Sequence, residues 1–423
     1  MRGFDVHSIA AVLVVLEAFG AGAVHAQEPV CRPDWSTVAT PFFPLSPLGP
    51  AQPIVRPQDV TDAHATFVAD PFLIHAGGLW YLFFEATIPR GVVALATSAD
   101  LATWHYEHIV LAEPFHMSFP NVFEVDGTYY MTPESAVRNS VRLYRAQSFP
   151  DRWDYVGDLV TGRPYADPSV FRRDGRWWMF VSIGDCSTGY LFSSDSLTSG
   201  WTEHPMSPIV VNNRGRARAA GRAVQMAGGR LFRLTQNDTP TYGRATRVFE
   251  VDVLTPTNYH EFEVPESPIL AASGSGWNAT GMHTCDPWWV GDHWVAAVDG
   301  LTGTSGWSIG LYGTPPPAPP PTDAAGMSAG GARLRCSPNP SRGAIVFSLA
   351  TPPQAGSVRA TLRIVDAAGR LVLQRPVVVP PAGQAQFTWD ARDRTGRAVP
   401  AGEYFCRTEF QGHTVQTRAI VTR

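Results

Sequence analysis

The chain has 423 residues, of which 44% are hydrophobic and 17% charged, and its 33 basic against 37 acidic side chains give a net charge of −4. This length predicts more than one folded domain. Every one of the 33 basic residues is an arginine, which excludes lysine Schiff-base chemistry and phosphate-loop lysines. The acidic surplus lies in the main body of the chain and argues against a nucleic-acid partner.

Residues 1–26 have the pattern of a secretory signal peptide, with an apolar run from Ile9 to Leu16 and the small residue Ala26 at the expected cleavage site. The apolar run is too short to span a membrane. We therefore expect a secreted or cell-surface protein with no membrane span. Residues 27–61 are rich in proline and predict an irregular lead-in.

Residues 62–312 repeat one pattern: a short strand, a tight glycine turn, a second strand and an outer edge. The copies open at residues 69–73, 118–122, 166–170, 220–224 and 285–289. A spacing of about 50 residues is typical of propeller blades made of four antiparallel strands. The pattern predicts an all-β chain whose main domain is a five-bladed β-propeller. The last copy is short, so we expect a strand near residues 62–67 to close the ring.

Residues 313–332 form a proline-rich linker, and residues 333–423 have short alternating strands separated by turns. This tail predicts a small immunoglobulin-like β-sandwich. Disulfides are possible in an exported chain, and Cys336 with Cys406 is the pair that we expect.

Carboxylates open three of the five repeats, at Asp70, Asp167 and Asp286. The first strand of each blade lines the central channel of a propeller, so these side chains are expected to converge. An Asp-Pro pair is also ordinary turn chemistry. Three at one repeat position favour a carboxylate-lined site, because gathering like charges costs free energy. Such carboxylates suit the cleavage of a glycosidic bond.

The Ala-Asp-Pro openings at residues 69–71 and 166–168 and the edge from Ser98 to Trp104 resemble the five-bladed propellers of glycoside hydrolase family 43. A closer resemblance is to the N-terminal propeller of plant glucosamine inositolphosphorylceramide transferases. It rests on five blocks that occur in order: Glu113–Pro120, Tyr129–Ser135, Tyr165–Ser169, Trp201–Pro205 and Gly281–His283. These resemblances imply a propeller that acts on a carbohydrate ligand.

The hydrolase resemblance implies roles for two aspartates: Asp70 matches the catalytic base, and Asp167 matches the residue that tunes the pKa of the acid and orients the sugar. The hydrolases have their general acid, a glutamate, where residues 220–222 of this chain hold Ala-Gly-Arg. We take Glu134 as the substitute acid, with a structural ion pair to an arginine as the alternative. The alternative function is a carbohydrate-binding propeller that has lost its general acid.

Further residues are expected at the substrate-binding site: His116, Arg218, Arg222, Trp277, His283 and Asp286. The two arginines would bind an anionic ligand or neutralise the channel acids. Trp277 would stack on a sugar or pack in the core. We expect neither a metal nor a cofactor.

The tail resembles the immunoglobulin-like C-terminal domains of secreted bacterial proteins, of the FlgD type or the type IX secretion sorting type. The resemblance rests on Ser337–Pro340, Val365-Asp366, Trp389-Asp390 and Gly402–Phe405. It implies that the tail engages a secretion machinery and takes no part in catalysis.

Overall fold

A computed structural model describes residues 31–49, 52–314, 332–353, 355–366, 370–410 and 413–422. The predicted signal peptide and most of the proline-rich linker lie outside these ranges. The described residues form strands and four short 3-10 helices: Pro57–Asp59, Ala136–Arg138, Ala227–Gly229 and Gly276–Asn278. None of their helices is long and apolar enough to cross a membrane.

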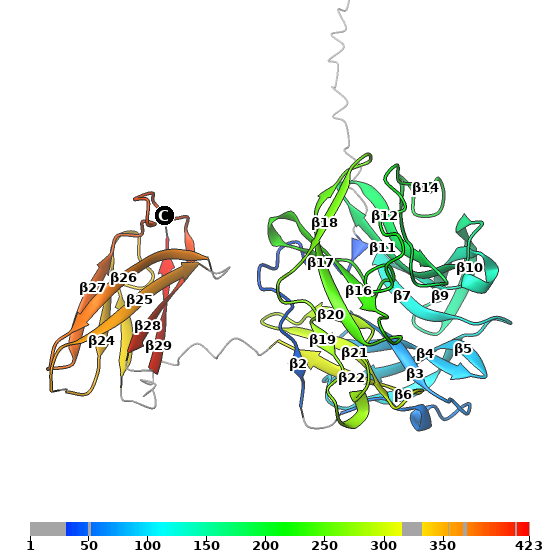
Figure 1. Cartoon of the computed structure of the whole chain (residues 1–423), viewed down its shortest axis with the longest axis horizontal. Coiled ribbons are helices and arrows are strands. Elements are labelled where there is room, and N and C mark those ends of the chain that lie inside the picture. The colour runs from blue at the N-terminus through cyan, green and yellow to red at the C-terminus, as the bar shows by residue number, and fades with distance from the viewer. Residues whose placement is uncertain are drawn as a thin grey trace, which may run out of the picture.

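Residues 31–49 and 52–314 form five antiparallel sheets (Figure 1). The first three contain β3 (Val68–Ala76), β4 (Leu79–Ile88), β5 (Arg90–Ser98) and β6 (His105–Leu111); β1 (Cys31–Arg32), β7 (Ser118–Val125), β8 (Thr128–Glu134), β9 (Ser140–Ser148) and β10 (Arg152–Thr161); and β11 (Tyr165–Arg173), β12 (Arg176–Ile183), β13 (Gly189–Ser194) and β14 (Thr202–Glu203). The other two contain β15 (Val224–Met226), β16 (Arg230–Asn237), β17 (Ala245–Leu254), β18 (Tyr259–Glu263) and β19 (Leu270–Ala271); and β20 (Cys285–Trp289), β21 (Trp294–Thr302), β22 (Gly306–Gly313) and β2 (Ser46–Pro47). The predicted propeller architecture is confirmed, while the count of five blades stays a prediction.

The lead-in is less irregular than expected, because it supplies an edge strand to two sheets. β1 pairs with β7, and β2 pairs with β22. The expected closing strand at residues 62–67 is therefore wrong: β2 occupies the outer edge of the last sheet. Trp35, also from the lead-in, packs edge-on against Trp288 and Trp294. Residues 32–37 of the lead-in also lie beside Ile74 and His75, at the end of β3 opposite to Asp70.

The repeated opening motif forms the same β-bulge in three inner strands. The register shifts between Ala69 and Phe72 in β3, and equivalent shifts occur in β7 and β11. Within the bulges the central residues Asp70, Phe119 and Asp167 have φ of 52°, 45° and 51°. Aspartate tolerates this left-handed conformation better than most residues. The bulge re-aims the side chain at the start of the strand, toward the mouth of the channel.

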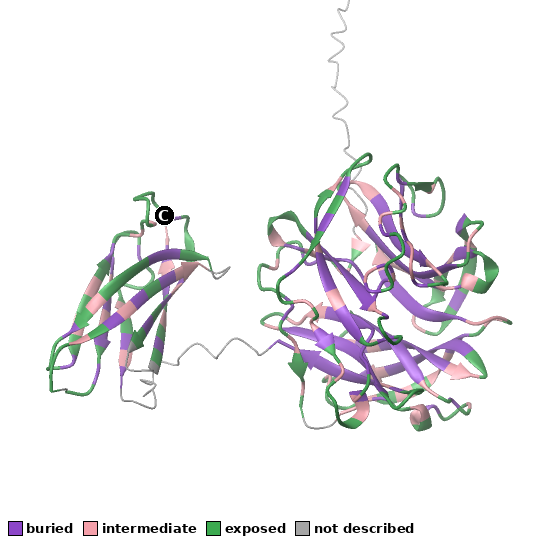
Figure 2. Ribbon diagram, in the orientation of Figure 1, coloured by how far each residue is buried: buried purple, intermediate pink, exposed green. Residues whose placement is uncertain are grey.

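Apolar side chains of neighbouring sheets pack together. Figure 2 shows in purple that most residues inside the strands are buried. In β3, for example, the seven residues from Val68 to Ile74 are all buried. Strands buried on both faces lack the polar–apolar alternation of a surface strand. The rigid packing of these inner strands holds the channel residues in place.

The tail forms two sheets of its own. One contains β23 (Arg333–Ser337), β24 (Ile345–Ala350) and β27 (Gln384–Trp389), and the other β26 (Leu371–Val379), β25 (Val358–Asp366), β28 (Gly402–Phe410) and β29 (His413–Val421). Trp389, Ile345 and Ile364 are fully buried between them. The predicted small sandwich is confirmed. The predicted Cys336–Cys406 disulfide is absent, because both thiols are free.

Candidate active site

A cavity of about 280 Å³ lies at the channel mouth where the inner strands begin. Its walls combine carboxyl groups, an arginine, two histidines and three aromatic rings. The lining residues are Phe67, Ala69, Asp70, Glu85, His116, Ser118, Glu134, Arg218, Tyr242, His283 and Trp307. Five of the residues predicted from the sequence, namely Asp70, His116, Glu134, Arg218 and His283, are therefore brought together here.

Asp70 is buried at the bottom of this cavity, with 4% of its surface exposed. Thr284 donates its hydroxyl to Oδ1 at 2.8 Å, and the backbone N–H of Phe119 donates to Oδ2 at 3.2 Å. Burial raises the pKa of Asp70 to about 6, and the nearby His283 opposes that rise. Asp70 therefore stays largely ionised at neutral pH.

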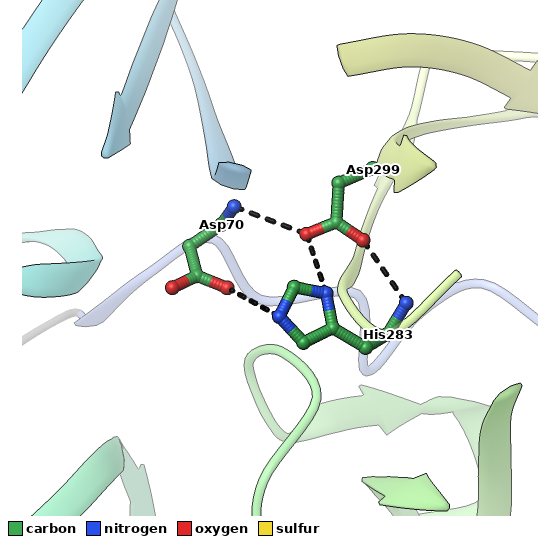
Figure 3. Close-up of side chains that lie close together, drawn as sticks. All are labelled: Asp70, His283 and Asp299. Carbon is green, nitrogen blue, oxygen red and sulfur yellow. Dashed lines mark hydrogen bonds and ion pairs between the residues drawn. The ribbon is translucent and has the colours of Figure 1, made fainter. Parts of the chain in front are cut away.

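His283 lies between two carboxylates (Figure 3). Its Nδ1 is 2.8 Å from Oδ2 of Asp299, and its Nε2 is 3.6 Å from Oδ1 of Asp70. In the described part of the chain, these three residues form the one group whose possible metal-ligating atoms lie within 4.8 Å of one another. The imidazole nitrogens face one carboxylate each, which is the arrangement of two ion pairs. We therefore assign no metal to this group.

Arg218 binds two acidic side chains at the cavity wall. It forms a two-pronged ion pair with Asp167, through Nε to Oδ2 and through Nη2 to Oδ1 at 3.1 Å, and Nη2 also donates to Oε2 of Glu134 at 3.0 Å. Asp167 is fully buried and also accepts a hydrogen bond from Gln236 at 2.8 Å. Of the two alternatives for Glu134, the contacts match the structural ion pair. Arg218 is equally occupied, so it offers little to an anionic ligand.

Glu85 is the carboxyl group that the sequence interpretation missed. It lies on β4 opposite Ala69, just as Glu134 lies on β8 opposite Ser118, so the two glutamates occupy the same repeat position. Its side chain is 6% exposed, Thr87 donates to Oε1 at 2.8 Å, and no hydrogen bond to Oε2 occurs among the described residues. Burial raises the pKa of Glu85 to about 8, so it holds a proton at neutral pH.

His116 closes the cavity beside Glu85. The backbone N–H of Gly91 donates to its Nδ1 at 2.9 Å, and its Nε2 lies 3.7 Å from Oε1 of Glu85. Burial lowers the pKa of His116. A neutral imidazole with an acceptor at Nδ1 has its proton on Nε2, facing Glu85.

The titration of Glu85 makes a testable contribution to stability. Its pKa is about 8 in the folded chain against 4.5 in the unfolded chain, so the folded state binds more protons between these values. Stability contributed by this group is complete below pH 4.5 and is lost as the pH rises through 8. We expect the melting temperature of Glu85→Gln to fall less than that of the wild type between pH 5 and 8. Equal slopes in thermal melts across this range would contradict the protonated Glu85.

Comparison with known proteins identifies the family of this chain. The family model of the N-terminal region of glucosamine inositolphosphorylceramide transferase 1 matches residues 44–301. The chain belongs to this family. An FlgD immunoglobulin-like domain model matches residues 339–409. The resemblance inferred from sequence is thus confirmed for the propeller and for the FlgD-like tail.

Among the family's curated members, glucosamine inositolphosphorylceramide transferase 1 of Arabidopsis thaliana is 35% identical over 258 residues, which are 57% of this chain and 33% of the relative. The chain spans about a third of the length of the curated relatives it matches. Among solved structures, the β-1,2-mannobiose phosphorylase of Listeria innocua has a TM-score of 0.50 at 13% identity and covers 64% of this chain and 96% of its own. A thermostable family-43 glycoside hydrolase has a TM-score of 0.45 at 13% identity, covering 58% and 88%.

Three of the residues predicted to bind substrate do not line the cavity of this family member. Arg222 and Asp286 form a two-pronged ion pair with each other, and both are at least 96% buried. Arg222 also donates to the backbone carbonyls of Val122 and Leu73. Trp277 packs against the ring of Tyr312. The ion pair thus matches the neutralising alternative, and the tryptophan matches the core alternative.

Residues 220–222, where the hydrolase resemblance implies the general acid, hold Ala-Gly-Arg, and the middle residue Gly221 is closely packed. A Cβ atom added here would overlap the carbonyl oxygen of Cys285, so the backbone packing leaves no room for any side chain. We expect Gly221→Ala to lower the free energy of unfolding by about 1–3 kcal/mol through overpacking. Gly184→Ala, where the added Cβ would meet only ordinary contacts, is the control. Urea denaturation compares the two, and equal stability of both variants would contradict the close approach.

Proposed function

We propose that the propeller binds a glycan in this cavity and hydrolyses a glycosidic bond, with Asp70 as the base and Glu85 as the proton donor. The observation that supports this best is how the carboxyl groups are partnered. Asp167 and Glu134 contact Arg218, whereas the described residues offer no arginine to Asp70 or Glu85. Two carboxyls whose environments separate their pKa values are typical of acid–base pairs.

At neutral pH each of the two groups has the protonation state that hydrolysis needs. Asp70, with a pKa of about 6, accepts a proton from the water that attacks the anomeric carbon. Glu85, with a pKa of about 8, gives its proton to the leaving glycosidic oxygen as the bond breaks. The rings of Tyr242 and Trp307 in the cavity wall offer apolar faces for a sugar.

The names of similar proteins support a sugar ligand. The curated relatives are named for glucosamine and inositolphosphorylceramide, and the Listeria innocua structure is titled as a complex with β-1,2-mannobiose. We extend only the common element, a carbohydrate, to this chain.

A second candidate function is glycan binding without cleavage. The observation that favours it is the Ala-Gly-Arg sequence of residues 220–222, because the segment where the hydrolase resemblance implies the general acid has no carboxyl group. In this case Glu85 would donate a hydrogen bond to the sugar without transferring its proton.

The site residues do not bear on where the protein acts. We propose that the chain is exported, on the signal-like pattern of residues 1–26, and that its FlgD-like tail engages a secretion machinery. Secretion of the intact chain, against retention of a chain lacking residues 1–26, tests the first part.

A glycan screen of the purified protein tests the proposed function. Plant and bacterial polysaccharides are incubated with the protein, and both reducing-end release and binding are measured on the same panel. Release of reducing ends supports the hydrolase, and binding without release on every bound glycan supports the second candidate. Neither release nor binding across the panel would contradict both.

A further inference from the structure

Asp299 accepts hydrogen bonds from two segments beside the cavity, one that contains Asp70 and one that contains His283. It is fully buried on β21, and its Oδ1 accepts the backbone N–H groups of His283 and Thr284, each at 3.0 Å. Its Oδ2 accepts the backbone N–H of Asp70 at 3.1 Å. Three such hydrogen bonds stabilise the ionised form of a buried carboxylate. One side chain therefore fixes the backbone of Asp70, in its bulge, relative to the backbone of His283.

The ring of His283 is fixed as firmly as its backbone. Its side chain is 3% exposed, and the ring packs against Trp307 with centroids 4.1 Å apart and against Tyr242 at 5.3 Å. Both ring nitrogens face carboxylate oxygens, at Asp299 and at Asp70 (Figure 3). Both contacts are ion-pair contacts, and the form of the ring that is attracted to both carboxylates is the doubly protonated imidazolium.

We propose that His283, held as an imidazolium by Asp299, is a fixed internal cation that keeps the Asp70 carboxylate ionised and oriented toward the cavity. Asp299 supplies the negative charge that keeps the imidazolium charged, and His283 passes the effect to Asp70. Both are positioning residues, since each acts on the reaction through Asp70. The importance of His283 and Asp299 for catalysis rests on the proposed function, whereas their effect on the charge of Asp70 does not.

The surroundings explain why Asp70 needs such a cation. Besides His283, the charged and titratable groups that face it are Asp299, Asp167, Glu85, Glu134, Arg218 and Tyr242. Most of these are acidic, and Arg218 is bound to Asp167. Burial and the Asp167 charge both raise the pKa of Asp70. His283 is the cation that opposes them directly.

The same groups account for the charge on His283. Burial has the largest single effect and disfavours the imidazolium, but the neighbouring carboxylates, Asp299 above all, together raise the pKa of His283 to about 9. Asp70 adds to this rise, and Arg218 opposes it. In return, His283 holds the pKa of Asp299 below its usual value despite burial.

The test measures the titration of Asp70 directly in the ligand-free, full-length protein. The infrared band of the protonated Asp70 carboxyl is identified by its loss in Asp70→Asn and followed against pH. In His283→Gln we expect its midpoint to move up by about one to three pH units. His116→Gln, which changes the neutral histidine of the same cavity, is expected to leave the midpoint in place. An unshifted midpoint in a folded His283→Gln protein overturns the proposal.

A measurement on the wild type keeps the proposal testable if His283→Gln does not fold. In protein with ¹⁵N-labelled histidine, an imidazolium signal with both nitrogens protonated is expected to persist at pH 8 and to be lost in Asp299→Asn. The absence of any such signal at pH 8 also overturns the proposal. If the Asp70 midpoint shifts as expected but no glycan is cleaved, the effect of His283 on Asp70 is confirmed and the proposed hydrolysis is contradicted.

Discussion

Replacing Asp70 by asparagine is expected to lower the rate of glycan release by about 10²–10⁴-fold, the usual contribution of a general base. The amide cannot accept a proton from water, whereas its shape and its remaining acceptor are nearly those of the carboxylate. Asparagine also tolerates the φ of 52° at this position. Initial rates of reducing-end release at pH 7, on whichever glycan the screen identifies, measure the effect.

A matched control is available in the turn between β11 and β12. Asp174 also has a positive φ, of 49°, but its side chain is 85% exposed and lies outside the cavity. Asp174→Asn is expected to release glycan at the wild-type rate. Full activity of Asp70→Asn, with both variants folded by circular dichroism, would remove Asp70 from the mechanism. Binding retained by an inactive Asp70→Asn would assign the loss to the chemical step.

The repeat pattern predicted that the three opening aspartates converge, and the structure brings Asp167 but not Asp286 to the side of the channel where Asp70 lies. Asp70 and Asp167 occupy the same position of the repeat. They lie in equivalent β-bulges of β3 and β11, and the fold brings both to the same end of the channel. The prediction was wrong for Asp286, which lies at a different depth along the channel. Asp286 also follows a strand opening, but its carboxylate accepts the backbone N–H of Leu73 at 2.6 Å, farther along β3 than Asp70. Spacing in the sequence does not by itself show how far along the channel a side chain lies.

Two acidic residues on the second strands of their sheets, Glu85 and Asp299, were not predicted, for a different reason. Glu85 and Asp299 come from β4 and β21, each within a run of buried residues in which nothing marks a channel position. The available signal was the cross-strand register, since Glu85 stands opposite Ala69 as Glu134 stands opposite Ser118. Applying the repeat to the second strand as well as the first would have placed Glu85 at the site. Asp299 accepts hydrogen bonds from His283 and Thr284, which lie just before β20, and only the folded structure shows this placement.

Replacing Arg222 by methionine is expected to lower the free energy of unfolding by about 3–5 kcal/mol, because it leaves the Asp286 carboxylate buried without its partner. Asp286 has no exposed surface, and burial already raises its pKa. Arg230→Met breaks an ion pair with Glu250 in which the arginine side chain is 42% exposed, so its cost is expected to stay below about 1 kcal/mol. Urea denaturation at pH 7 measures both variants.

The double variant Arg222→Met, Asp286→Leu separates the role of the pair from the role of the arginine. Removing both charges leaves no uncompensated carboxylate, and the double variant is expected to be more stable than Arg222→Met alone. It is also expected to bind and cleave glycan as the wild type does, because the pair does not line the cavity. If Arg222→Met instead kept its full stability and lost glycan binding, Arg222 would be a ligand-binding residue, as the sequence suggested. The stability and binding of one variant thus decide between a structural cation in the channel and a functional one.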